Sequence, residues 1–303
     1  MIATSPFDQY LDGIAAGADL DPAVVGELSR NPDILAAGML ADALKRRLHG
    51  GRVTFVRVAQ CPFDQSFADA VPPAACEVRI GGAPGTLDVA ASAVRSAKAV
   101  AGERPVTGFS WGDVERLAKN GNGHDGRVGP VLVALRQAGL EALAEVALDT
   151  LSDPAAVLEQ LRSAGYERIR LHVARPIAGD RAAFFLNVAA LQRQFGGIEA
   201  ISPLPSSLSA FRPTTGYDDV KAVAIARLAA PLVPHVQVDW TRYGPKLAQV
   251  ALTFGADDVD GISPSDAAPE GRRRAPLEEI RRNIEAAGFE AVERGGRFTM
   301  PAA

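Results

Sequence analysis

Short segments with a strand-like hydrophobic pattern alternate with helix-like segments along most of the chain. Each strand-like segment is either continuously apolar or apolar at alternate positions, as buried and half-buried strands are. Eight such segments are Val53–Val58, Cys76–Ile80, Val106–Ser110, Leu143–Leu148, Ile169–Ala174, Ile198–Leu204, Val236–Trp240 and Asp257–Ile262. Because strands that alternate with helices pair in parallel through crossover connections, the pattern predicts an α/β fold with a parallel sheet.

Segments with apolar residues three or four positions apart lie between these strands and predict helices. From the second strand onward they are Leu87–Val100, Asp113–Ala118, Val131–Ala138, Pro154–Ala164, Ala182–Phe195, Tyr217–Leu232, Pro245–Phe254 and Pro276–Ala287. Two more, Phe7–Ala16 and Ile34–Leu48, precede the first strand, and a glycine pair ends the second of them. We therefore expect residues 1–50 to form a helical amino-terminal extension and residues 51–303 to form a single barrel domain.

Eight strand–helix units in roughly 240 residues have the size of a TIM-type (β/α)8 barrel. A doubly wound open sheet fits the same alternation, but the glycine-rich turn Gly81–Gly85 does not spell the dinucleotide-binding pattern GxGxxG. The stretch Cys61–Ala75, between the first two strands, is too short for a crossover helix with two loops. The sequence thus favours a (β/α)8 barrel that can be incomplete around its first crossover.

The composition is that of an ordinary globular protein. The 303 residues are 47% hydrophobic and 22% charged, which excludes a wholly disordered or fibrous chain. A formal net charge of −4 and an aromatic content of 6% argue against a nucleic-acid-binding surface. No apolar run approaches the roughly 18 residues of a membrane span, and the first residues show no basic leader. We expect a cytoplasmic protein that binds neither nucleic acid nor membranes.

Candidate functional residues follow from the barrel, because such barrels place their sites at the carboxyl ends of the strands. Three ionisable residues expected there suit acid–base catalysis, namely Asp149, His172 and Asp239. Asp239 is the leading candidate for a general base, since the following tryptophan would add an apolar wall beside the acid. The residues that we expect to contact a ligand are Gly81, Gly82, Ser110, Arg175, Trp240 and Asp260.

Several of these positions also have a structural interpretation. The two glycines can form only a tight turn, Asp149 can begin the cap of the next helix, and His172 can be a buried core histidine. His235 falls at the amino end of a strand, the end of a barrel that serves stability. Asp257 and Asp258 fall where the last strand begins, so we interpret them as turn residues.

The sequence contains no recognisable metal-binding or hydrolase motif. Its four histidines form no HxH or HExxH pattern, and its two cysteines are too few for a disulfide framework or a thiolate zinc site. The GxSxG and GxxxxGK[ST] patterns are absent too. A Mg²⁺ site made by Asp149, Asp239 and Asp260 across the barrel mouth is conceivable. On the motifs alone we predict no metal site.

Three stretches near the end of the chain, His235–Trp240, Gly244–Leu252 and Phe254–Gly261, resemble a known family. They are similar to the radical SAM enzymes of the futalosine route to menaquinone, aminofutalosine synthase and dehypoxanthine futalosine cyclase. A weaker likeness covers the helical lead-in around Arg46–Gly50 and the second strand, Glu77–Gly82. The resemblance implies a barrel with a pocket for a related ligand, and a glycine pair that contacts the amino-acid part of S-adenosylmethionine.

The chain departs from this family in the loop after the first strand. Family members carry CxxxCxxC there, and the three thiolates hold a [4Fe–4S] cluster whose fourth iron binds S-adenosylmethionine. Here the loop Val58–Gln65 contains only Cys61, and Cys76 comes 15 residues later. We therefore expect no iron–sulfur cluster and no other resident cofactor, while the resemblance leaves binding of S-adenosylmethionine open.

Two functional hypotheses follow. The first is a cluster-less radical-SAM-like protein of menaquinone biosynthesis, which binds a nucleoside or a chorismate-derived intermediate, or acts as a non-catalytic partner of a cluster-bearing homologue or of a second copy of itself. The second is a barrel enzyme that performs polar acid–base chemistry, as a lyase or hydrolase, on a related aromatic carboxylate or nucleoside. The sequence leaves open whether the chain is an enzyme.

Overall fold

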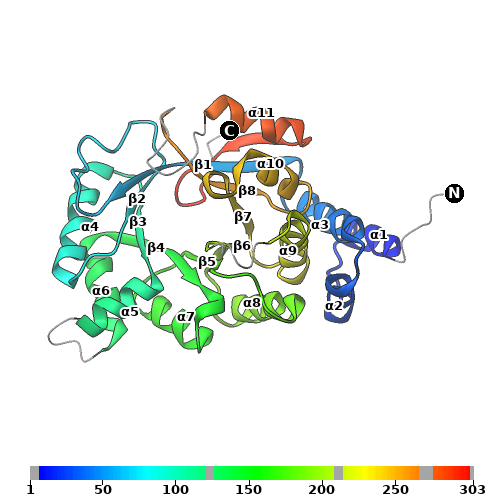
Figure 1. Ribbon diagram of the computed structural model, residues 1–303, viewed down its shortest axis with the longest axis horizontal. Coiled ribbons are helices and arrows are strands. Elements are labelled where there is room, and N and C mark those ends of the chain that lie inside the picture. Colours follow the sequence, from blue (N-terminus) through cyan, green and yellow to red (C-terminus); the bar gives the residue numbers. More distant parts are fainter. Residues whose placement is uncertain (1–6, 121–125, 208–213, 266–275, 301–303) are drawn as a thin grey trace.

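The computed structural model describes residues 7–120, 126–207, 214–265 and 276–300, and these form a closed barrel of parallel strands (Figure 1). The strands are β1 (Arg52–Pro62), β2 (Glu77–Gly81), β3 (Val106–Ser110), β4 (Leu140–Ala147), β5 (Ile169–Val173), β6 (Ile198–Pro205), β7 (His235–Asp239), β8 (Asp258–Ile262) and β9 (Glu290–Glu293). Consecutive strands from β2 to β8 are neighbours, and β1 pairs with both β8 and β2, which closes the barrel. The predicted TIM-type (β/α)8 fold is confirmed.

Helices cover the outside of the barrel (Figure 1). Those after β2 are α4 (Leu87–Ala101), α5 (Trp111–Asn120), α6 (Val128–Ala138), α7 (Pro154–Ser163), α8 (Arg181–Phe195), α9 (Gly216–Ala229), α10 (Trp240–Leu252) and α11 (Leu277–Ala286). The chain before β1 forms α1 (Leu11–Ala15), α2 (Pro22–Arg30) and α3 (Ile34–His49). Within the described residues, no helix is both long enough and apolar enough to cross a membrane.

Side chains that accept hydrogen bonds from the first backbone amides fix where several helices begin. Asp33 caps α3 by accepting from two amides, and Asp180 and Thr215 cap α8 and α9. Asp21 caps α2, a helix of nine residues that the sequence analysis did not predict. The apolar face of α2 is short, so its capping aspartate is a clearer sign of a helix in the sequence than its hydrophobic pattern.

The first crossover contains no helix, as its length predicted. Strand β1 pairs directly with β2, with Val58 opposite Glu77 and Cys61 opposite Ile80. The connecting residues 63–76 contain turns and bends and no regular element. The barrel is nevertheless closed at this point, because β1 is 11 residues long and its carboxyl half alone pairs with β2.

The amino half of the same β1 edge is covered by β9, which the sequence analysis did not predict. Arg52 to Phe55 pair in parallel with Glu290 to Glu293. The chain then turns across the amino end of the barrel, where Arg294 donates to Asp258 at 2.6 and 2.8 Å. The last described residues therefore close the end of the barrel opposite the expected site.

Gly296 lies where this closing segment meets the barrel. An added Cβ would lie 2.6 Å from the carbonyl oxygen of Cys76 and 2.6 Å from Pro105 Cγ, closer than side-chain atoms pack. We expect Gly296→Ala to lower the free energy of unfolding by about 1–3 kcal/mol, the usual range for overpacking. Urea unfolding measures this, with Gly85→Ala, whose Cβ would meet no neighbour, as the control. Equal unfolding midpoints for the two variants would show that the segment is not packed as described.

Several boundaries differ from the predicted ones, and β1 continues to Pro62, four residues beyond its predicted end. Strand β4 begins at Leu140, three residues earlier than predicted, and β8 begins at Asp258. Trp240 does not end β7 but begins α10, because Asp239 accepts a hydrogen bond from the backbone amide of Arg242 and caps that helix. These shifts leave the residues expected at the carboxyl ends of the strands near those ends.

Candidate functional site

A small polar cavity lies inside the barrel near the carboxyl ends of the strands. Side chains from β1, β2 and β4 to β8 form its wall. Its ionisable lining residues are Arg79, Glu145, His172, Asp239, Arg242, Tyr243 and Asp260. Its volume of about 60 Å³ accommodates a few water molecules. The structure thus brings together three residues chosen from the sequence, His172, Asp239 and Asp260.

His172 is enclosed in the barrel wall and shares the cavity with an ion pair. Burial lowers the pKa of His172, although the charge of Glu145 opposes this, so the imidazole is neutral at neutral pH. Burial alone would raise the pKa of Glu145, but His172 and Arg242 outweigh it and lower that pKa. The guanidinium of Arg242 lies 3.2 Å from Glu145 Oε1. A neutral imidazole beside an ionised carboxylate and a guanidinium is a set that can accept and return a proton.

Asp239 lines the cavity and also holds the start of α10. Its Oδ1 accepts hydrogen bonds from the amide of Arg242 at 3.0 Å and from Thr241 Oγ1 at 2.8 Å. Gly261 lies against this carboxylate with φ of +75°, and a Cβ there would come within 3.1 Å of Oδ1. Asp239 therefore has a structural role as a helix cap in addition to its place in the cavity.

Asp260 is held by Arg79 at the base of the cavity. Arg79 donates to both carboxylate oxygens, at 2.8 and 3.0 Å. Burial would raise the pKa of Asp260, but the charge of Arg79 outweighs it and holds that pKa well below the usual range. Asp260 is therefore ionised and paired near neutral pH, which suits a positioning or binding role better than that of a general base.

A buried charge network lies beneath the cavity. Glu77 is fully buried and accepts from Arg170 at 2.9 and 2.8 Å and from Arg79 at 3.0 and 2.8 Å. Thr107 Oγ1 donates to the same carboxylate at 2.6 Å. Burial would raise the pKa of Glu77, but Arg170 and Arg79 outweigh it and lower the pKa to about 2. The side chains that shape the floor of the cavity are thereby fixed.

Asp149 and Arg175 lie together in a second, larger cavity, apart from the residues around His172. This cavity of about 800 Å³ is bounded by the loop after β5, Phe184 and Ser207. Asp149 accepts hydrogen bonds from the amides of Ala174 and Arg175, at 2.6 and 3.0 Å. It thus holds the loop after β5 and does not cap the following helix. Asp149 and Asp239 line different cavities, so the three aspartates considered as Mg²⁺ ligands are not brought together.

The glycine pair expected to contact a ligand forms a tight turn over an aromatic ring. The carbonyl oxygen of Gly81 accepts from the amide of Phe63 at 2.9 Å. Gly82 has φ of +89°, and an added Cβ would lie 2.7 Å from the Phe63 ring. The structural interpretation of this turn is therefore supported, and contact with a ligand stays a prediction.

Ser110 and Trp240 also lie outside the wall of the small polar cavity. Both the amide and the hydroxyl of Ser110 donate to Asp113, at 2.9 and 2.8 Å, and fix the start of α5. Trp240 is 1% exposed and packs in the core between α10 and the barrel. An indole enclosed in this way does not offer the stacking surface that the sequence suggested.

The two cysteines lie beside different parts of strand β1, and only Cys61 belongs to it. Cys61 is opposite Ile80, whereas the amide of Cys76 donates to the carbonyl of Arg57, four residues earlier on β1. At about 3.3 Å per residue this separates the two positions by roughly 13 Å along the strand. Gln60 lines the cavity, so the neighbouring Cys61 points to the opposite face of β1. The pair does not fit the ligand loop of a [4Fe–4S] cluster.

Sequence reasoning missed several residues of the cavity, namely Gln60, Arg79, Glu145, Arg242 and Gln237. The sequence does contain a signal for such residues, which is the alternation of side chains between the two faces of a strand. Polar side chains two positions apart inside a predicted strand, as in Glu77 and Arg79, mark the face that turns toward the barrel axis.

Asp257 and Asp258 are not turn residues. Both are at most 1% exposed, and each carboxylate forms an ion pair with a buried arginine, Arg227 for Asp257 and Arg294 for Asp258. His235 lies at the amino end of β7, as expected, and its Nδ1 donates a hydrogen bond to the Asp257 carboxylate at 2.6 Å. The amino end of the barrel is therefore closed by buried charge pairs.

Comparison with curated proteins finds relatives of two named activities. The chain is 36% identical over 121 residues to a 5-amino-6-(D-ribitylamino)uracil–L-tyrosine 4-hydroxyphenyl transferase of Archaeoglobus fulgidus, covering 36% of this chain and 35% of the relative. It is 38% identical over 92 residues to aminodeoxyfutalosine synthase of Streptomyces coelicolor, covering 28% of this chain and 24% of that relative. The chain resembles the futalosine-pathway radical SAM family.

These relatives are matched over part of their length. The alignment to the transferase of Methanosarcina barkeri is longer, 210 residues at 29% identity, and spans 54% of that relative. The chain thus spans about a third of the first relative and about half of this one. No family model matches the chain.

Solved structures share the fold of the chain. Methylornithine synthase superposes with a TM-score of 0.65 at 13% identity, over 93% of this chain and 96% of that one. The hydrogenase maturase of Carboxydothermus hydrogenoformans superposes with a TM-score of 0.66 at 14% identity, over 96% of this chain and 80% of that one. At such identities the likeness establishes the barrel alone.

Proposed function

We propose that this chain is a cluster-less relative of the futalosine-pathway radical SAM enzymes, which binds a small molecule at the carboxyl end of the barrel. The placement of the cysteines carries the proposal. Cys61 points away from the cavity and Cys76 lies beside Arg57, so the two thiols are not arranged as ligands of one cluster. Without three thiolates the chain has no means of holding S-adenosylmethionine on an iron.

The ligand class that we propose is a nucleoside or a chorismate-derived carboxylate of that pathway. The polar cavity offers Arg79 and Arg242 as cationic donors, with Gln60 and Gln237 as neutral hydrogen-bonding groups. A separate cavity of about 800 Å³ beside Arg175 is within the size range of small-molecule sites.

Two measurements on the purified chain test this proposal. Anaerobic reconstitution with iron and sulfide is expected to leave the protein without a four-iron cluster and without 5′-deoxyadenosine production. Thermal unfolding with aminodeoxyfutalosine is expected to show a higher midpoint, since a ligand at 100 times its Kd stabilises the native state by about 2.7 kcal/mol. Near-stoichiometric cluster loading with production of 5′-deoxyadenosine would contradict the cluster-less assignment.

An Arg242→Gln variant links the ligand to the cavity. It removes the guanidinium that faces Glu145 but keeps a polar side chain on α10, so we expect the ligand-induced rise in midpoint to be lost. Arg281→Gln, which changes an exposed pair on α11, is the matched control and should keep the rise. A full rise in the Arg242 variant would place the ligand elsewhere.

A second function, acid–base catalysis, is favoured by one observation. The neutral imidazole of His172 shares the cavity with the ionised Glu145 and with Asp239. In this function His172 accepts a proton from a nucleoside or aromatic carboxylate, and Asp239 helps to orient that substrate.

Turnover should then fall about 10²-fold or more in His172→Gln. Asp239→Asn keeps the helix cap, so it separates loss of charge from loss of fold. Unchanged turnover in both variants would reject this function.

A further inference from the structure

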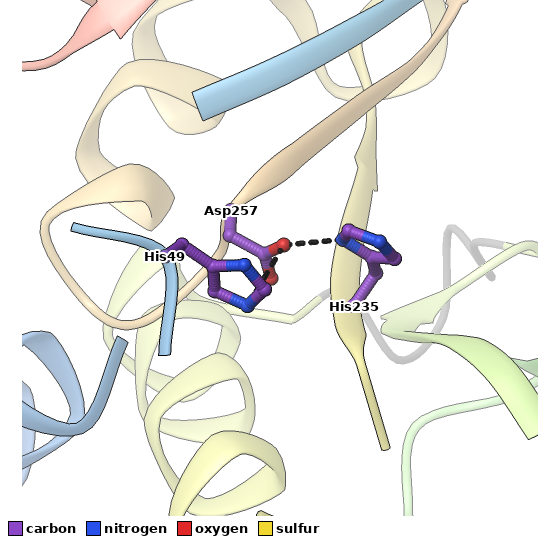
Figure 2. Close-up of side chains that lie close together, drawn as sticks. All are labelled: His49, His235 and Asp257. Carbon is purple, nitrogen blue, oxygen red and sulfur yellow. Dashed lines mark hydrogen bonds and ion pairs between the residues drawn. The ribbon is translucent and has the colours of Figure 1, made fainter. Parts of the chain in front are cut away.

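A cluster of two histidines and an aspartate lies at the amino end of the barrel, the end opposite the candidate site. His49 ends α3, His235 begins β7 and Asp257 directly precedes β8 (Figure 2). Among the described residues, these are the three histidine, cysteine or acidic side chains whose ligand atoms come close enough to hold a metal ion. The cluster belongs to no part of the site proposed above.

The three potential ligand atoms already converge. His235 Nδ1 lies 2.6 Å from Asp257 Oδ2, and His49 Nε2 lies 3.4 Å from the same oxygen. All three atoms lie within 4.8 Å of one another. Ligand atoms bound to one tetrahedral zinc ion at about 2.0–2.2 Å are themselves roughly 3.4 Å apart. The two imidazoles are stacked with ring centroids 5.4 Å apart, so zinc binding would turn them until both nitrogens face the ion.

We propose that His49, His235 and Asp257 form a zinc-binding site. Two imidazoles and a carboxylate are a known type of zinc ligand set, in which water occupies a fourth position. That position is available, because the cluster borders a cavity of about 220 Å³ that is also lined by Arg52 and Phe298. The site is thus reachable from solvent while its carboxylate is 1% exposed.

The surroundings of Asp257 orient its carboxylate for this role. Oδ1 is held by Arg227 and accepts from the amide of Val236 at 2.8 Å, which leaves Oδ2 directed at the two imidazoles. A ligand whose outer oxygen is fixed by hydrogen bonds is a common arrangement around bound metals. The carboxylate is ionised, since Arg227 and His235 outweigh the effect of burial and hold the pKa of Asp257 well below its usual range.

Zinc binding exchanges existing contacts for metal bonds. His49 Nε2 gives up its 3.0 Å hydrogen bond to the carbonyl oxygen of Pro234, and the proton between His235 and Asp257 is released to solvent. Because the ligands come from α3, β7 and the residue before β8, the ion would join the amino-terminal helices to the barrel. No local motif marks this site, because its ligands lie far apart along the chain.

The test uses tag-free protein from which metal has been removed by dialysis against a chelator. Titration with Zn²⁺ alone is expected to show one ion bound per chain and a higher midpoint of thermal unfolding. Co²⁺ in the same protein should give the visible absorption of a four-coordinate site. An adventitious surface ion would give neither a defined stoichiometry nor this spectrum.

Two variants assign the ligands. In His49→Gln the amide nitrogen takes the place of Nε2, and in His235→Asn it takes the place of Nδ1, so each keeps a hydrogen-bond donor without an imidazole ligand. We expect each variant to fold and to bind Zn²⁺ at least 10-fold more weakly than the parent. His172→Gln, which removes a histidine at the other end of the barrel, should bind Zn²⁺ normally. Unchanged affinity in both cluster variants, or no stoichiometric uptake by the parent, would overturn the proposal.

Discussion

Replacing Glu77 with glutamine is expected to lower the free energy of unfolding by about 3–5 kcal/mol. The Glu77 carboxylate is fully buried and accepts hydrogen bonds from Arg79, Arg170 and Thr107. Glutamine has nearly the same shape, so the substitution removes the charge that two guanidinium groups share in the barrel interior. The loss is large because breaking a buried ion pair leaves a buried charge uncompensated.

Urea unfolding of the parent and of Glu77→Gln measures this loss. Glu278→Gln provides the matched control, because it removes the same charge from an exposed pair with Arg281 on α11. We expect the control to change the free energy of unfolding by no more than about 0.5 kcal/mol. Coincident unfolding curves for Glu77→Gln and the parent would mean that the network beneath the cavity is not formed.

This network links the stability of the barrel to the shape of its site. Arg79 pairs with Glu77 on one side and with Asp260 in the cavity wall on the other. Barrels of this type are usually filled by branched apolar side chains. Buried ion pairs contribute little net stability compared with apolar packing, so the polar interior favours a binding site over a purely structural core.

The barrel could be predicted from the sequence because its signal is local. The segments Val106–Ser110, Ile169–Ala174 and Ile198–Leu204 each carry the apolar pattern of a strand, and each matches an observed strand within one residue at either end. Strand β9, Glu290–Glu293, was missed because it is short, half-buried and polar at both ends. Its position is fixed by pairing with β1, a contact that joins distant parts of the chain.

The site could be predicted only in part, for a related reason. His172, Asp239 and Asp260 were found because each lies at or near the end of a predicted strand. Asp149 lies in an equivalent place, yet it binds the backbone of the loop after β5, and no local pattern distinguishes the two uses of an aspartate. Asp258 falls where the last strand was predicted to begin, and the turn predicted there is wrong because its carboxylate pairs with Arg294, 36 positions further along the chain.

Acidification is expected to destabilise the protein steeply below pH about 4.5. A carboxyl whose pKa is lower in the folded state contributes stability above its unfolded pKa, and this is lost as the pH falls toward the folded pKa. The pKa of Glu77 falls from 4.5 to about 2 on folding. At about 1.4 kcal/mol per pKa unit, this shift contributes roughly 3 kcal/mol to the free energy of unfolding at neutral pH. Asp257 and Asp260 add to the loss in the same direction, because Arg227 and Arg79 lower their pKa values as well.

Urea midpoints measured from neutral pH down to pH about 3 test this, and Glu77→Gln provides the internal comparison. The variant has already lost the carboxyl at position 77, so its midpoint should fall less steeply with pH than that of the parent. The two curves should approach each other toward pH about 2, where the parent Glu77 is itself half protonated. Parallel curves would show that Glu77 has an ordinary pKa, and that Arg79 and Arg170 do not hold it in its charged form.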